Sequence, residues 1–130
     1  MNAAFRTAAA LALMLQSAAG AGEVIAHPSV KLNANDIRDV FLGEAQIAGG
    51  LKLVPVDNSA AQEAFLAAVL QTNSRNYAAR WTRKAFREGL PPPSVKGSDA
   101  EVMSFVRATP GAIGYLAGHA GPGVNVLDRF

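Results

Sequence analysis

The pattern of apolar and polar positions predicts an alternation of short strands and helices along the chain. Runs rich in Val, Ile and Leu predict strands over residues 23–27, 51–56, 112–117 and 124–127. Between these runs, apolar residues recur three or four positions apart, as they do on one face of a helix. Strands interleaved with helices are typical of an α/β domain with a buried, mixed sheet.

Two of the expected helices begin with the spacing of a capping box. Ser59 and Ser98 each stand three residues before a Gln or Glu. The first of these helices would bury one stripe of residues, namely Ala61, Ala64, Phe65, Ala68 and Val69. The second would bury Val102, Phe105 and Val106.

The other two expected helices are also bounded by capping and breaking residues. Asn33 can cap a helix that Gly43 ends, with Ile37, Val40 and Phe41 on its buried face. Ser74 is a candidate cap for a helix over residues 76–87, and Gly89 with three following prolines ends it. This helix would turn inward Tyr77, Ala78, Trp81 and Ala85.

The first 21 residues have the pattern of a cleaved signal peptide. Arg6 supplies a positive start, residues 7–15 are mostly apolar, and residues 19–21 are small, as a signal peptidase requires. A membrane anchor is the alternative, but a spanning helix needs about 20 apolar residues, and Gln16 ends the apolar run. We therefore expect a mature domain over residues 22–130, without a membrane span, in the periplasm or outside the cell.

The composition limits the kinds of bonds, sites and partners that we expect for this domain. The sequence contains no Cys, so neither a disulfide nor a thiolate metal site can form. The chain has 12 Lys and Arg against 10 Asp and Glu, and without Arg6 the balance becomes 11 against 10. A charge so close to neutral gives no support to nucleic-acid or membrane-surface binding.

The sequence lacks the common catalytic and metal-binding motifs. It has no Gly-x-Ser-x-Gly elbow, no Walker-type phosphate loop and no His-Glu-x-x-His pattern. His27 and His119 are its only histidines, and neither has carboxylates at the spacing of a metal site. We therefore expect a protein that is not an enzyme and that uses no metal or cofactor.

Two helix starts are the best candidates for ligand binding. One follows the polar turn formed by Asp57, Asn58, Ser59, Ala60 and Ala61, and the other follows Gly97, Ser98 and Asp99. Free N–H groups and the helix dipole favour anions at such ends, and small side chains would let an oxyanion approach the backbone. The alternative is that Ser59 and Ser98 only cap their own helices.

Four segments resemble successive motifs of the phosphate ABC-transporter substrate-binding proteins. They are residues 37–43, 53–65, 97–102 and 109–115, and the last, Thr-Pro-Gly-Ala-Ile-Gly-Tyr, is the most specific. The resemblance covers residues 24–117 and corresponds to one of the two lobes that close around phosphate in that family. It implies a single lobe of a type 2 periplasmic-binding-protein fold, with a mixed sheet flanked by helices.

The resemblance also implies which residues would bind phosphate. In the family, the turn carries an Arg and then a Ser-Gly-Thr triplet, and these positions hold Pro55 and then Ser59, Ala60 and Ala61 here. Only Ser59 keeps a side-chain donor, and the Arg that would pair with the anion is replaced. The implied partners are an ABC permease and a weakly held phosphate or similar oxyanion.

A second hypothesis is an interaction module that keeps the lobe fold without binding a ligand. Four basic residues would form a stripe on one helix, which is either a solvated face or a docking face for an acidic partner: Arg80, Arg83, Lys84 and Arg87. Leu66 and Leu70 lie off the expected buried stripe of their own helix. They would either form a homodimer contact or fill the core of the domain.

Overall fold

The chain is described from a computed structural model over residues 21–130, so the predicted signal peptide, apart from Ala21, lies outside the described residues. The first elements are β1 (Glu23–Ala26), a 3₁₀ turn (Ala34–Asp36), α2 (Ile37–Phe41), β2 (Ile47–Ala48), β3 (Leu51–Lys52), β4 (Val54–Asn58) and α3 (Gln62–Phe65). A π-helical turn (Leu66–Leu70) continues α3. The remaining elements are α4 (Ser74–Glu88), β5 (Ser94–Lys96), α5 (Asp99–Ala108), β6 (Ala112–Leu116) and β7 (Asn125–Arg129).

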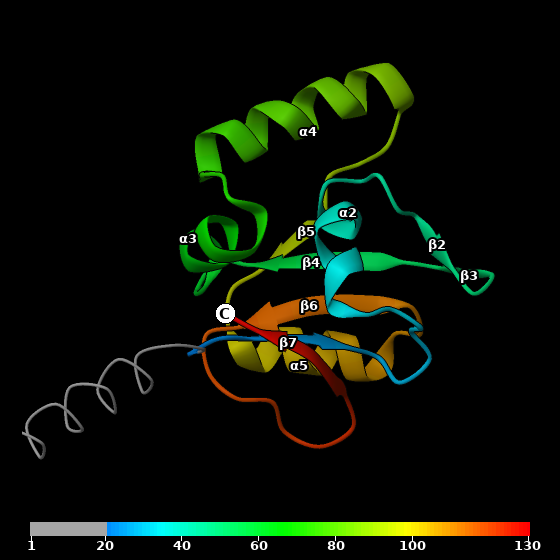
Figure 1. The fold of residues 1–130 in the computed structure, drawn as a ribbon, viewed down its shortest axis with the longest axis vertical. Coiled ribbons are helices and arrows are strands. Elements are labelled where there is room, and N and C mark those ends of the chain that lie inside the picture. Colours follow the sequence, from blue (N-terminus) through cyan, green and yellow to red (C-terminus); the bar gives the residue numbers. More distant parts are fainter. Residues whose placement is uncertain (1–20) are drawn as a thin grey trace, which may run out of the picture.

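Five of the strands form one mixed sheet in the order β5-β4-β6-β1-β7 (Figure 1). Strand β4 runs parallel to β5 and β6, whereas β1 runs antiparallel to β6 and β7. The short strands β2 and β3 form a separate hairpin. Its turn, Gly49 and Gly50, has φ values of 56° and 79°, which residues other than glycine rarely adopt. The predicted α/β fold with a mixed sheet is confirmed.

The sheet separates two hydrophobic clusters, one on each of its faces. On one face α5 packs against the strands, and this cluster contains Ile25, Val56, Val102, Val106, Ala112 and Leu116. A Cβ on Gly114 would lie 2.8 Å from Val102, so the glycine permits the close approach of α5. The larger cluster, on the other face, joins α2, α3 and α4 to β1 and β6.

The helical segment after β4 differs from the expected one because part of it is a π-helix. The wider π turn adds a residue to the repeat and therefore shifts which side chains face the core. Leu66 and Leu70 are buried, whereas Ala64 and Ala68 are exposed. The predicted stripe is wrong at the two alanines. The homodimer contact is also wrong, because the two leucines fill the domain's own core.

Two other predicted boundaries shift for identifiable reasons. Helix α4 begins at Ser74, because the Asn73 side chain accepts a hydrogen bond from the Asn76 amide at 2.9 Å and is the cap. The expected strand 51–56 is two strands, since the Val54 amide donates to Gly111 O and the chain passes there from the hairpin to the main sheet. The sequence pattern does not predict β5, because three residues after a proline run show no alternation.

Helix α4 is held to the rest of the molecule by few side chains. Figure 1 shows it apart from the sheet, at the opposite end of the view from α5. Of its 15 residues, Tyr77 and Trp81 are the buried ones, and Ala78, which was expected to face inward, is exposed. The Trp81 indole donates to Phe41 O at 3.0 Å and thereby ties α4 to α2.

Candidate functional site

The predicted anion-binding turn lies at the carboxyl end of β4, beside the end of β5. Asn58 is fully buried, while Ser59 and Ala60 are exposed. Asn58 fixes the turn, because its Oδ1 accepts the Ala60 amide and its main-chain oxygen accepts the Ala61 amide, both at 3.0 Å. The Ser59 amide donates to Lys96 O at 2.9 Å. The amides of Ala60 and Ala61 are therefore hydrogen-bonded within the turn.

The start of α3 is nevertheless open. Ala61 is the N-cap and no side chain caps the helix, so the predicted capping box of Ser59 is wrong. The amides of Gln62, Glu63 and Ala64 begin the first turn, and within residues 21–130 they have no acceptor. Together with the exposed Ser59 hydroxyl, these amides are the donors that this end of the sheet offers to a ligand.

The start of α5 is closed by its own side chains. Ser98 Oγ accepts the Glu101 amide at 3.2 Å, and the Glu101 carboxylate accepts the Gly97 amide at 2.8 Å. The carboxylate reaches the residue before the cap, whereas the usual capping box returns to the cap itself. Gly97 and Ser98 are therefore occupied in capping the helix, which was the alternative interpretation of Ser98.

The Asp99 carboxylate accepts hydrogen bonds at the ends of β4 and β6. It accepts hydrogen bonds from the Asn58 side chain at 2.8 Å, the Ala117 amide at 2.9 Å and the Gly118 amide at 3.0 Å. Burial alone would raise the pKa of Asp99, but these three donors outweigh it and lower the pKa. The sequence-predicted residues Asn58 and Asp99 thus come together, bound to each other rather than facing a ligand.

Asp57, the first residue of the predicted turn, is buried and hydrogen-bonded to side chains of the core. Its carboxylate accepts the Tyr115 hydroxyl at 2.7 Å and the Tyr77 hydroxyl at 3.0 Å, and it is buried. Burial raises the pKa of Asp57, although the two tyrosine hydrogen bonds act against this. Tyr115 also stacks on Phe65 with ring centroids 3.9 Å apart. Asp57 therefore joins β4, β6 and α4, and it shares the lining of one groove with Gln62, the first residue of α3.

The positive charge that the family places at the turn is not reproduced by a nearby side chain. Pro55 lines an apolar cavity of about 260 Å³ with Leu53, Trp81 and the prolines at 91–93. Lys96 stands opposite Asn58 in the strand register, but its Nζ lies over the Phe105 ring, 4.5 Å from the centroid. The first turn of α3 itself carries an acidic residue, Glu63.

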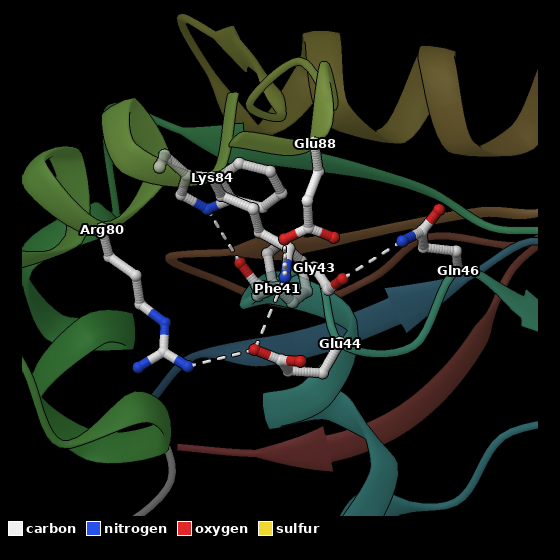
Figure 2. A network of polar contacts seen from close by, with 8 residues as sticks. Phe41, Gly43, Glu44, Gln46, Arg80, Lys84 and Glu88 are labelled. Carbon is white, nitrogen blue, oxygen red and sulfur yellow. Dashed lines mark hydrogen bonds and ion pairs between the residues drawn. The ribbon is translucent and has the colours of Figure 1, made fainter. Parts of the chain in front are cut away.

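The basic stripe predicted on α4 is divided by ion pairs (Figure 2). Arg80 lies 3.2 Å from Glu44, and Lys84 lies 3.5 Å from Glu44 and 3.1 Å from Glu88. In the part of the chain that the structure describes, Arg83 and Arg87 take part in no salt bridge. Two of the four basic residues, Arg80 and Lys84, are therefore paired with acidic side chains.

The two histidines contact a serine and a carboxylate, respectively. His27 contacts Ser29 at 2.7 Å, and His119 lies 3.3 Å from the buried Glu23, which also accepts from Arg129. No group of three or more potential ligands of a metal ion occurs within residues 21–130. Across these same residues, none of the helices is both long and apolar enough to cross a membrane.

Comparison with known proteins identifies the fold. No protein family and no curated protein matches the sequence. Three solved structures match 83% of the chain. They are a phosphate ABC transporter substrate-binding protein of Clostridium perfringens with bound phosphate (TM-score 0.61, 17% identity), PstS of Borrelia burgdorferi (0.55, 18%) and an ABC-type phosphate transport receptor of Vibrio cholerae (0.50, 14%).

These likenesses show the fold and the part of it that is present. The chain spans 44%, 46% and 45% of the length of the three structures, in the same order. The described residues therefore form a single lobe of a type 2 periplasmic-binding-protein fold, as the four sequence motifs predict. At such identities the comparison carries no residue role to this chain.

Proposed function

We propose that the chain is an exported oxyanion-binding module that holds phosphate or a similar anion at the start of α3. The observation that carries this proposal is the open first turn of α3, where the amides of Gln62, Glu63 and Ala64 have no acceptor within residues 21–130. The same fold in a Clostridium perfringens protein with bound phosphate supports it. The function is binding without catalysis.

Each residue near this turn has a defined task in the proposal. The amides of the first helical turn and the helix dipole attract the anion, and the Ser59 hydroxyl donates one further hydrogen bond. Ala60 is exposed and small, so it leaves room for the anion beside the backbone. Asn58 binds no anion itself but fixes the turn that presents these donors.

The expected affinity is low. Hydrogen bonds to a charged group contribute about 1.5–3 kcal/mol each, and association costs roughly 4 kcal/mol or more. Pro55 supplies no charge, and the Asp99 carboxylate repels a second anion on the same end of the sheet. A few hydrogen bonds in an open site therefore give a Kd in the millimolar range, near −4 kcal/mol.

The proposal also includes where the module is located and which partner it serves. The signal-peptide pattern of residues 1–21 supports export to the periplasm or the outside of the cell. Two of the solved structures with this fold are named as parts of ABC-type phosphate transport systems, which suggests an ABC transporter as the kind of partner. Transfer of the anion to a permease is the corresponding partner hypothesis for this chain.

The proposal is tested by titrating the isotope-labelled mature protein with phosphate at low ionic strength and following its amide NMR signals. We expect saturable shifts at Gln62, Glu63 and Ala64, with sulfate at matched ionic strength as the comparison anion. A Ser59→Ala/Ala60→Leu double variant should lose these shifts, because it removes a donor and fills the approach to the backbone.

Ser98→Ala is the matched control, because this hydroxyl caps α5 and is not free for a ligand. It should bind phosphate as the parent protein does. The proposal fails if no saturable shift occurs well above millimolar phosphate, or if the double variant and the parent protein respond alike.

A further inference from the structure

An exposed aromatic side chain of α4 borders a groove between α4 and β5. The Phe86 side chain is 91% exposed, far more than is usual for an apolar residue of this size. Next to it, an open groove of about 810 Å³ runs between α4 and β5. Trp81, Pro92, Pro93 and Val95 contribute to its lining, and Val95 is itself 58% exposed. An apolar surface of this kind is a site for a partner.

The described residues that line the groove include no basic side chain, but a row of arginines on α4 lies beside Phe86 at its border. Residues four apart form a ridge on a helix, and Arg75, Arg83 and Arg87 share one such ridge with Ala79. This ridge adjoins the one that carries Thr82 and Phe86 along the groove. Within the described chain, no salt bridge neutralises any of the three arginines. The acidic group in the groove wall, Asp57, is buried and bonded to two tyrosines.

We propose that the groove between α4 and β5 binds an acidic protein segment, whose apolar side chain packs against Phe86 and whose carboxylates pair with the arginine ridge. Aromatic and arginine side chains together are typical of the energetic centre of a protein interface. This surface lies on α4, so the proposal is independent of anion binding at the start of α3.

Other occupants fit these observations less well. A second copy of the chain on this face would bring two arginine ridges together, and like charges destabilise such a contact. The edge strand β5 could accept an added strand, but it is only three residues long and offers few main-chain groups for pairing. An anionic membrane surface attracts arginine, but it offers no protruding segment to fill a concave groove.

The chain contains a natural reporter for this binding. Trp81 is its single tryptophan, is 4% exposed and lines the groove. The test is a fluorescence titration with a blocked synthetic peptide of glutamates that carries two leucines four positions apart. A saturable change in Trp81 emission is expected with this peptide, and none with the counterpart in which lysines replace the glutamates.

Variants on α4 locate the contact. Phe86→Ala should weaken binding about tenfold or more, as loss of an interface anchor does. Because Phe86 is exposed, this variant should keep the melting temperature of the parent protein, which separates lost binding from lost folding. Arg83→Gln should weaken binding about threefold, as loss of a rim ion pair does.

Arg80→Gln is the matched control, because it removes the same charge from the same helix at a position already paired with Glu44. It should bind the acidic peptide as the parent protein does. The proposal is overturned by any of four results: no saturable change with the acidic peptide at low salt, equal binding of the lysine peptide, equal losses in Arg80→Gln and Arg83→Gln, or binding to phosphatidylglycerol vesicles alone.

Discussion

The two helix starts at the carboxyl edge of the sheet have similar sequences but opposite structures. Both follow a strand end, and both begin with Ser three residues before Gln or Glu. At α5 the serine caps the helix and a carboxylate covers the preceding amide. At α3 the serine hydroxyl is exposed and the first-turn amides are open.

The difference follows from the residue that precedes each serine. Asn58 precedes Ser59 and captures the Ala60 amide with its side chain, so the helix begins later and the serine is displaced from the cap position. Gly97 precedes Ser98 and has no side chain that could compete. A capping-box sequence therefore forms a cap only where the preceding residue leaves the amides available.

The strongest way to break this comparison is to remove Asn58, which bonds to both helix starts. Asn58→Ala deletes hydrogen bonds to Asp99, to Tyr115 O and to the Ala60 amide in a fully buried position. We expect the free energy of unfolding to fall by about 3 kcal/mol, measured by urea denaturation. Asn125→Ala, at an exposed position of β7, serves as the control and should change it little.

A smaller loss is expected from removing the carboxylate of Asp99. Asp99→Ala should lower the free energy of unfolding by about 2 kcal/mol near neutral pH, because three donors lose their acceptor. The folded-state pKa of Asp99 is lowered. Its stabilisation is therefore present above the unfolded pKa of about 3.9 and is lost as the pH falls through the folded value.

The difference in stability between the parent protein and Asp99→Ala should accordingly shrink as the pH is lowered from about 5 to about 3. Asp128→Ala provides the comparison, because within residues 21–130 that carboxylate accepts a hydrogen bond only from the amide of the next residue. An equal cost for the two variants near neutral pH would contradict the role given to Asp99.

The smallest expected changes in unfolding free energy come from replacing the two serines, and they compare the two helix starts directly. Ser98→Ala should cost about 1 kcal/mol of unfolding free energy, as loss of a helix cap does. Ser59→Ala should cost about 0.5 kcal/mol or less, because its exposed hydroxyl makes no intramolecular hydrogen bond in the described chain. Parallel thermal melts measure both, and equal losses would mean that Ser59 is a cap after all.

The sequence predicts the elements of this fold better than their contacts. Periodicity locates β1 and β6, and capping-box spacing locates the start of α5, because these features depend on neighbouring residues. It fails at Leu66–Leu70, where a π turn selected by packing changes which residues face inward. It also cannot show that Glu44, on the loop after α2, pairs with Arg80 and Lys84 of α4, which divides the basic stripe.

The candidate site shows the same limit. Asp57, Asn58, Ser98 and Asp99 are polar residues at helix starts, which favours an anion site on sequence grounds. In the structure, most of these groups are hydrogen-bonded within the protein. Asn58, for example, donates to Asp99, which is 41 positions away in the sequence. Local spacing cannot reveal whether a donor is free or already bound.

The strand order has a consequence for how the chain reaches its fold. Strand β1 is the first to be synthesised, yet it lies between β6 and β7, and Gly22 and Phe130 exchange two main-chain hydrogen bonds. The β1–β6 pair near the centre of the sheet therefore forms only after β6 is available. Contacts of such long sequence separation slow folding, so β1 stays without this partner in the growing chain until β6 has been made.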